Sequence, residues 1–551
     1  MKKSVRITLA VVIGTLLTGL AYYLLLPAIN VHNKGFWAFL ILVALFYTVP
    51  LGFRPLRLIE EKTAKKKPAR RDGFEKGVNI AALSVVGAAL AVLIIGGIIS
   101  SRFFNARQYA SVIEVKESEF SADMPEADKV SNISLMDTAS ASIIGNRALG
   151  SLSDVVSQYQ LNGTYNQINY KGTPKKVDQL EYVDFFRWLN NRNKGVPGYV
   201  MVDPVNNTAE YVRFDKPLTY VDSGWFNDDL MRKLHFSYPT KIFNAANFEL
   251  DEEGRPWFIV PCLKPHVGLF GAMDVSEVII FDPVDGTSTI YPVAEVPSWV
   301  DNVFDGYLAS DKYDWYGILS GGWWNSVLGK TGCKQCTDDF GYIVIGDDVW
   351  YFTGVTSVSG DESNIGFIIT NARTGEYRYY PVVGAEEYSA MHAAEGEVQE
   401  KGYVASFPSL INVSGQATYI MVLKDNGGLV KLYALVNVEK YSIVATGTTQ
   451  EAAKEAYLEL LVREGLISES DIPGTDDPAA ETETASVTVT DVRLAVMDGE
   501  TIVYVTADDG CVYRGRLSAD ESLILLSAGQ SVTFTYTATD HPAIRAIAGW
   551  Q

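Results

Sequence analysis

Two cysteines three positions apart form the most specific chemical pattern in the chain. Cys333 and Cys336 enclose a lysine and a glutamine, and this CxxC spacing suits a redox pair, half of a metal site or a local disulfide. No second CxxC and no close histidine completes a zinc site, and the segment lacks the strand-to-helix setting of a thioredoxin motif. We therefore expect a disulfide between them or two plain thiols, with thiol–disulfide chemistry as an alternative.

Aromatic and acidic side chains nearby form a second group of candidates. Trp323 and Trp324 offer ring faces that stack on sugars or line a peptide groove, although packing between structural units would use the same residues. Asp361 and Glu362 follow a loop rich in Gly and Ser, where carboxylates bind a cation or polar ligand, or only cap the next strand. We predict that these four residues bind a ligand.

Other motifs in the chain indicate no chemistry. Gly329-Lys330-Thr331 ends like a phosphate-binding loop, but Trp324 stands where that loop needs glycine. His392 and Glu395 share a helix face, yet no second histidine is near them, which favours a solvated surface over a metal site. No nucleophile motif surrounds the remaining histidines, so we predict no catalytic residue, metal or cofactor.

Three apolar stretches precede all these residues. They cover residues 7–28, 36–53 and 78–99, and none contains Asp, Glu, Lys or Arg. Stretches of this length and composition cross a bilayer, so we predict a membrane anchor over residues 1–105 with three transmembrane helices. A cleaved signal peptide is the alternative for the first stretch, but no small-x-small cleavage pattern ends it.

Positive charge predicts how the anchor is oriented. The chain starts with MKKSVR, and residues 54–76 contain nine Lys and Arg against four acidic residues. Cations in short loops stay on the cytoplasmic side of a membrane. We therefore predict a multi-pass protein of the cell membrane, with its N-terminus in the cytoplasm and everything after about Ser101 outside the cell.

Charge also distinguishes the anchor from the rest of the chain. Residues 1–107 hold 15 cations and 4 anions, whereas the remainder holds 31 cations and 62 anions. Such an excess of negative charge argues against nucleic acid as a partner. Four cysteines are too few for a disulfide scaffold in a domain of this size.

A strand–turn–strand pattern recurs in the acidic part and predicts an α+β fold. Hairpins with Gly-containing turns are followed by helical stretches, so we expect repeated antiparallel sheet-plus-helix units that pack against one another. The clearest copies begin at Phe248, Tyr342 and Phe407, with a fainter one near Ile168. The expected helices are Ser298–Tyr307, Ala385–Val398 and Thr449–Arg463, the last with Thr448 and Glu451 at the spacing of a capping box.

Composition divides this part into four regions. Residues 106–245 form a first α+β region, and residues 246–466 contain the repeated hairpin and helix units. Residues 467–486 are acidic and rich in Pro and Thr, which predicts a solvated linker. Residues 487–551 alternate short strands with turns, which predicts a small β-barrel of five or six strands.

Two stretches resemble a family of uncharacterised polytopic membrane proteins of Gram-positive bacteria. They are DESNIGFIITNARTGEYRYYPVVGAEEYSAMHAAEGEVQ and YVASFPSLINVSGQATYIMVLKDNGGLVKLYALVNVEKY. This resemblance implies a compartment and no activity. The hairpin-plus-helix units are also similar in pattern to PepSY-type domains, which implies a regulatory role outside the cytoplasm, and the terminal barrel resembles an OB-fold.

Taken together, these features predict a non-enzymatic binding or scaffold protein, anchored in the membrane and facing outward. The expected partners are the lipid bilayer and another envelope protein, a peptide or a wall glycan. Two alternatives remain: an envelope hydrolase that uses carboxylates near Asp338, Asp339 and Asp361, and a thiol–disulfide protein that uses Cys333 and Cys336. A hydrolase would require these carboxylates in one cleft beside Trp323 and Trp324.

Overall fold

A computed structural model describes most of the chain. It covers residues 3–51, 73–127, 135–150, 152–358, 363–468, 483–497, 500–517, 520–538 and 543–550. The chain divides into two compact units, Met1–Leu460 and Leu461–Gln551. The first unit combines helices with four larger sheets and the second contains a closed barrel, which confirms the α+β class.

Three apolar helices begin the chain, but only two are long enough to cross a membrane. The helices α1 (Lys3–Leu25) and α4 (Gly73–Ile99) contain apolar stretches of 19 and 23 residues. The helix between them, α2 (Lys34–Thr48), has 15 residues. At 1.5 Å per residue it is about 22 Å long, shorter than a hydrocarbon core of about 30 Å. The prediction of three full spans is therefore wrong for the described residues, because α2 ends close to Pro50, which has no N–H to continue the helix.

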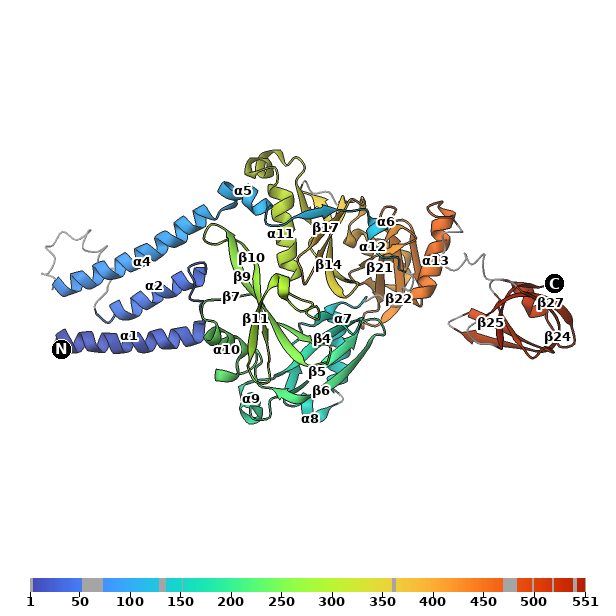
Figure 1. The fold of residues 1–551 in the computed structure, drawn as a ribbon, viewed down its shortest axis with the longest axis horizontal. Coiled ribbons are helices and arrows are strands. Elements are labelled where there is room, and N and C mark those ends of the chain that lie inside the picture. Colours follow the sequence, from blue (N-terminus) through green and yellow to red (C-terminus); the bar gives the residue numbers. More distant parts are fainter. Residues whose placement is uncertain are drawn as a thin grey trace. The chain divides into compact units, whose positions relative to one another are not determined.

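The three helices lie side by side at one end of the first unit (Figure 1). The chain runs toward the sheets along α1 and α4 and away from them along α2, so Lys3 and Gly73 lie at the ends far from the sheets. Only 17% of each long apolar stretch is buried, and side chains such as Leu16 and Ile80 are 68% and 65% exposed. These two helices are compatible with a membrane anchor.

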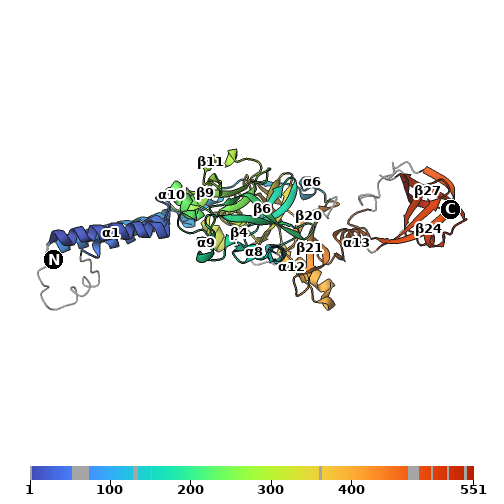
Figure 2. The ribbon, with the colours of Figure 1, turned by 90° about the horizontal axis from the view of Figure 1, so that it is seen from below.

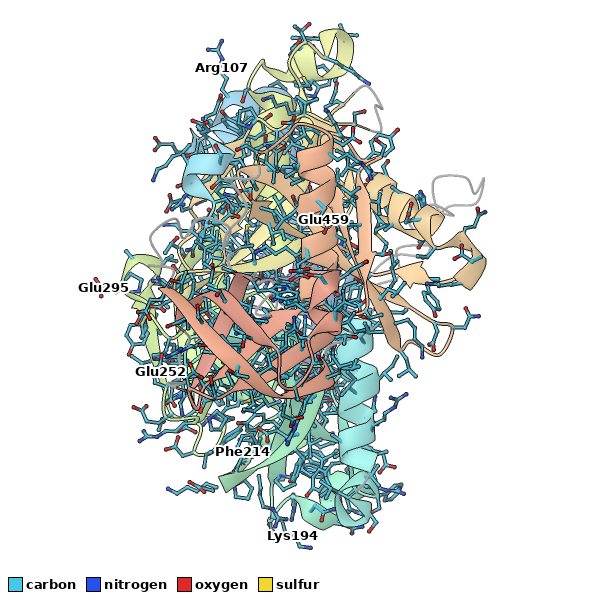
Figure 3. All side chains as sticks on the ribbon, turned by 90° about the vertical axis from the view of Figure 1, so that its right-hand side faces the viewer. Arg107, Lys194, Phe214, Glu252, Glu295 and Glu459 are labelled. Atoms are coloured by element: carbon cyan, nitrogen blue, oxygen red, sulfur yellow. The ribbon has the colours of Figure 1, made fainter. Side chains whose placement is uncertain are left out.

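The four larger sheets share one strand connectivity. In each, two short strands pair with the same edge of a long strand, and the next strands of the chain continue the sheet from its other edge. In the second sheet, for example, Ile242 and Phe248 from two short strands pair with Leu263 and Phe258 of the same long strand, Pro256–Val267, whose other edge pairs with the strand Gly271–Phe281. Figure 3 draws the described side chains on the ribbon, and in it the exposed residues Arg107 and Lys194 lie at opposite ends of the view.

The strands follow the order of the chain within each sheet. The first sheet contains β2 (Tyr159–Leu161), β3 (Asn166–Tyr170), β4 (Thr173–Tyr182), β5 (Val196–Asp203) and β6 (Thr208–Leu218). The second contains β7 (Ile242–Phe243), β8 (Asn247–Leu250), β9 (Pro256–Val267), β10 (Gly271–Phe281) and β11 (Ser288–Pro292). The third contains β12 (Lys334–Cys336), β13 (Gly341–Ile345), β14 (Asp348–Ser357), β16 (Gly366–Asn371) and β17 (Tyr377–Tyr380). The fourth contains β19 (Val404–Ala405), β20 (Ser409–Val413), β21 (Gln416–Lys424), β22 (Val430–Asn437) and β23 (Val444–Gly447).

Two hydrophobic cores join the sheets in pairs. The first and second sheets share a core that includes Trp188, Phe248 and Phe281. The third and fourth sheets share another, which includes Phe367 and Tyr419. Each sheet therefore buries an apolar face against a neighbouring sheet, as the alternation of its strands requires.

Helices cover and connect the sheets. Between the first apolar helices and the second core lie α5 (Arg102–Ala110) and α6 (Phe120–Asp123); the others are α7 (Thr138–Gly150), α8 (Ser153–Val156), α9 (Phe185–Asn191), α10 (Leu230–Ser237), α11 (Gly306–Leu319), α12 (Glu387–Glu397) and α13 (Gln450–Arg463). The helices expected near residues 385 and 449 are present. Thr449, and not Thr448, caps α13, since its hydroxyl accepts a hydrogen bond from the N–H of Ala452 at 3.1 Å.

The helix expected over residues 298–307 is absent. The backbone N–H groups of Val303 and Phe304 donate to the carbonyl of Ala372. Those of Asp301 and Asn302 donate to the carboxylate of Glu249, in β8. A helix begins only at Gly306, after Asp305, whose side chain accepts from the N–H of Leu308 at 2.8 Å. Long-range hydrogen bonds thus override the local helical pattern.

An arm follows the apolar helices and runs along the third and fourth sheets. Its strand β1 (Val115–Glu117) pairs in parallel with β17. Farther along, the carbonyl of Met124 accepts a hydrogen bond from Asn412 at 2.9 Å, and the carboxylate of Glu126 accepts one from the N–H of Ser414 at 2.6 Å. The sheets are therefore joined to the segment that leaves α4.

The second unit contains a closed five-stranded barrel, as the alternating strands predict. Its order is β24-β25-β26-β28-β27, with β26 and β28 parallel (Figure 2). The strands are β24 (Glu483–Met497), β25 (Glu500–Ala507), β26 (Val512–Arg516), β27 (Ser531–Ala538) and β28 (Ile544–Trp550). Residues 469–482, most of the expected linker, lie outside the described residues, and 483–486 already belong to β24.

Candidate functional site

The first feature of functional interest is the contact between the sheets and the connection after α1. The N–H of Ile29 donates to the carbonyl of Pro239 at 2.6 Å, and the side-chain amide of Asn30 donates to that of Thr240 at 2.9 Å. The Nδ1 of His32 lies 2.9 Å from the carbonyl of Leu269. This connection is therefore fixed to the loops that flank the second sheet.

The end of α4 is held in the same way. The hydroxyl of Ser100 accepts hydrogen bonds from the N–H groups of Leu269 and Phe270 at 2.8 and 2.9 Å. A side chain at Gly96 would overlap the ring of Phe270, so glycine allows the turn between β9 and β10 to rest on the last turns of α4. Two apolar helices thus end against one surface of the folded part.

The predicted ligand residues Trp323 and Trp324 lie beside this surface. The ring of Phe103, four residues after α4, is 4.6 Å from that of Trp323 and 6.1 Å from that of Trp324 between centroids. Trp324 and Leu328 are 64% and 74% exposed. A short helical turn, Asn325–Gly329, presents these apolar side chains outward. The structure thus groups the two tryptophans with the end of the apolar helix α4.

The other sequence candidates do not join this group. Asp361 and Glu362 lie outside the described residues. Asp339 lines a cleft in which neither Trp323 nor Trp324 takes part. Asp339 and the two tryptophans therefore do not share this cleft.

The CxxC cysteines are free thiols, both buried. Cys333 and Cys336 are 4% and 8% exposed, and their sulfur atoms contact different carbonyl oxygens, those of Ile318 and Ser310. Burial raises the pKa of the Cys336 thiol well above its usual range. A protonated, inaccessible thiol is a poor nucleophile, so the arrangement favours plain thiols over redox chemistry.

Metal binding gains no support from the described residues. Among them, no three His, Cys, Asp or Glu side chains come together as ligands would. Of the helical pair considered above, the Glu395 carboxylate accepts a hydrogen bond from the N–H of Ala405 at 2.9 Å, which gives it a structural role instead.

A cleft of about 460 Å³ opens where the first, third and fourth sheets meet. Its aromatic walls come from Tyr307, Phe340, Tyr342 and Phe407. The size lies within the range of small-ligand sites, which spans about 300–1,000 Å³. Sequence reasoning did not identify this cleft, because its walls come from segments far apart in the chain.

Lys176 lies in the buried part of this cleft. It is 2% exposed, and burial lowers the pKa of its ammonium group to about 8. The ammonium lies 5.2 Å from the centre of the Tyr342 ring. Within the described residues it has no hydrogen-bond or ion-pair partner, in contrast to Lys175, which is 2.7 Å from the Asp203 carboxylate.

Two carboxylates line the cleft, and only one has a cationic partner. Asp137 accepts from the Lys424 ammonium at 2.6 Å and from Ser140. Burial would raise the pKa of Asp137, but the hydrogen bonds from Lys424 and Ser140 outweigh it and lower the pKa. Asp339 is exposed and only accepts from the N–H of Phe340. The cleft therefore has no paired carboxylates poised as acid and base.

The sequence analysis also did not identify Glu249 and Asp301, two acidic residues that are buried close together away from the cleft. Glu249 is fully buried, and burial raises its pKa to about 7. Its carboxylate accepts from the N–H groups of Asp301 and Asn302 at 2.8 and 2.7 Å. Since these bonds join the second sheet to the loop before α11, the group is structural.

Comparisons with known proteins supply no family. No family model matches the chain, and no curated protein is significantly similar to it. The resemblance to uncharacterised Gram-positive membrane proteins therefore stays a prediction. Function has to be argued from the helices, the exposed aromatic turn and the cleft.

Proposed function

We propose that the protein is a membrane-anchored binding protein whose folded part lies outside the bacterial cytoplasmic membrane. One observation carries this proposal: the apolar turn with Trp324 and Leu328 is exposed to solvent beside Phe103, which follows the long apolar helix α4 by four residues. Aromatic residues are enriched where membrane proteins meet the interface of the bilayer.

The same surface gathers further aromatic rings. Tyr22, near the end of α1, lies 5.8 Å from the ring of Phe236, and the Arg232 guanidinium lies 4.4 Å from the ring centre of Tyr23. The indole N–H of Trp37 donates to the carbonyl of Val31 at 2.8 Å. A belt of rings with polar partners suits the headgroup region of a membrane that α1 and α4 cross.

The distribution of charge supports the proposed orientation of the protein in the membrane. Lys3 and Gly73 lie on the side of the helices away from the sheets (Figure 1), and the sequence between α2 and α4 is rich in Lys and Arg. Cations in such a loop favour the cytoplasmic side. The folded part, with its excess of acidic residues, then faces outward. In this arrangement the chain runs back along α2 toward the basic loop between α2 and α4 (Figure 1).

The shared connectivity of the four sheets supports an origin by repetition of one unit of PepSY type. The barrel order, with its parallel closing pair, supports an OB-like terminal module. Modules of these two kinds present surfaces for binding, and we take the partner to be an envelope protein, a peptide or a wall fragment.

Impermeant thiol labelling tests the proposed location. In a Cys511→Ser background, Val383→Cys places a thiol at an exposed position of the folded part, and Ala69→Cys places one in the basic loop. We expect an impermeant maleimide to label position 383 in intact cells and position 69 only after lysis. Labelling of position 69 alone in intact cells would reverse the orientation, and labelling of neither would overturn the outward location.

A further inference from the structure

We infer that the cleft beside Lys176 binds a small molecule through a single carboxylate group. This inference rests on the proposed function, because a binding protein outside the membrane meets peptides and wall fragments that carry such groups. It deepens that proposal by assigning the ligand class and the residue that recognises it.

The charge of Lys176 lacks a hydrogen-bonded partner among the described residues. A buried lysine usually has a carboxylate or several hydrogen-bond acceptors around it, because water no longer stabilises its charge. Within the part of the chain that the structure describes, Lys176 contacts the ring face of Tyr342 and makes no hydrogen bond, and the one carboxylate whose charge acts on it, Asp137, already pairs with Lys424. An anion in the cleft would supply the missing partner.

The position of Lys176 on its strand directs its side chain toward the cleft. Lys175 and Lys176 are consecutive in β4, so their side chains point to opposite faces of the first sheet. Lys175 reaches Asp203, whereas Lys176 points to the face that the third and fourth sheets enclose. Lys176 is thus directed into a cleft of ligand size.

The groups that line the cleft indicate which kind of anion would bind there. Among the described residues, the other charged groups that line the cleft are Asp137, which is neutralised by Lys424, and the exposed Asp339; Tyr307 and Tyr342 are the titratable neutral groups. A single unpaired ammonium among these described groups favours a ligand with one negative charge over a phosphate dianion. Aromatic walls from four rings favour an apolar body attached to that carboxylate.

Calorimetric titration of the purified full-length chain in lipid nanodiscs tests the inference with matched probes. N-acetylphenylalanine carries the carboxylate, N-acetylphenylalaninamide replaces only that group with a neutral amide, and inorganic phosphate offers a different anion. We expect N-acetylphenylalanine to bind at least about tenfold more tightly than the amide, as loss of a charge-assisted hydrogen bond predicts. Absence of carboxylate binding, or tighter binding of phosphate, would overturn the assignment.

Two variants separate the cleft from other surface cations. Lys176→Met keeps the length of the side chain and removes its charge, and we expect it to abolish the preference for the carboxylate. Lys175→Met, on the opposite face of the same strand, should leave that preference intact. Thermal unfolding of each variant checks that it is folded. Unchanged binding by a folded Lys176→Met protein would refute the role of Lys176.

The outcome is independent of the membrane location. Labelling of positions 383 and 69 reports the location whether or not the cleft binds an anion. If position 383 is labelled as expected but no carboxylate binds, only the assigned ligand class is wrong. If the carboxylate binds but the labelling is reversed, only the proposed outward location is wrong.

Discussion

The Lys312 ammonium lies 2.7 Å from the Asp274 carboxylate, and the two residues are only 3% and 7% exposed. The pair connects α11 to β10 and therefore joins the helix before the third sheet to the second sheet. The ammonium also lies 4.6 Å from the ring centre of Phe304. Because neither charge reaches bulk water, each depends on the other.

Removing one partner of this pair should strongly destabilise the first unit. We expect Lys312→Met to lower the free energy of unfolding by about 3–5 kcal/mol, since it leaves the buried carboxylate with only the half-exposed His266, 3.8 Å away, beside it. Chemical denaturation of the full chain in detergent measures the loss. Lys116→Met is the control: Lys116 pairs with Glu376 at 3.1 Å but is 62% exposed, so its loss should cost less than about 1 kcal/mol. Equal effects of the two variants would contradict the proposed dependence on burial.

Lys176→Met should raise stability instead of lowering it. The folded-state pKa of Lys176 is about 8, below the unfolded value of 10.5. The charge therefore destabilises the fold fully below pH 8, and this penalty is relieved as pH rises from about 8 to 10.5, where only the unfolded chain keeps the proton. We expect Lys176→Met to gain on the order of 2–3 kcal/mol at neutral pH.

The pH dependence provides the check on this prediction. The difference in stability between Lys176→Met and the parent protein should narrow between pH 8 and pH 10.5, as measured by calorimetry. Carboxylate binding should weaken over the same range, because the ammonium loses its proton. A variant that is less stable than the parent at neutral pH would show that Lys176 is satisfied in the fold.

The exposed turn at Trp324 should touch the bilayer. A fluorophore attached to Leu328→Cys, in the Cys511→Ser background, is expected to be quenched by lipids that carry a nitroxide near the headgroup. The same dye on Val383→Cys serves as the matched exposed position, since Val383 is 64% exposed on the segment before α12. Comparable quenching at both positions would contradict a specific contact of the turn with lipid.

Thiol reactivity should follow burial. Cys262 and Cys336 are buried, and burial raises the pKa of Cys262 to about 12, so both should react slowly with maleimide at neutral pH. Cys511, which is partly exposed in the second unit, should react first. Mass spectrometry of partly labelled protein measures the order. Rapid labelling of Cys336 under native conditions would restore the thiol–disulfide hypothesis.

Local patterns predicted the parts of the fold that local interactions determine. The barrel strands and the helices near residues 385 and 449 follow from alternation and helical periodicity. The expected span over residues 36–53 failed because Pro50 lies within its apolar run. The helix over residues 298–307 failed because Glu249 and Ala372 capture its backbone N–H groups.

The candidate sites depend on contacts between distant segments. The type of residue at Trp323 suggested a binding surface, but its neighbour Phe103 belongs to the segment after α4, more than two hundred positions earlier. Lys176 left a weak signal, because two consecutive lysines in one strand force one of them inward. That signal could not identify the cleft, whose walls come from three sheets.

The arm that contains β1 has a consequence for biosynthesis. Residues 115–117 are made early, yet their strand partner is β17, and Lys116 pairs with Glu376, which is 260 positions later. If the first unit is exported as proposed, β1 cannot pair with the third sheet until most of that unit has crossed the membrane. Maturation of this protein should proceed largely after export, with the anchored helices holding an incomplete chain close to any chaperone at the membrane surface.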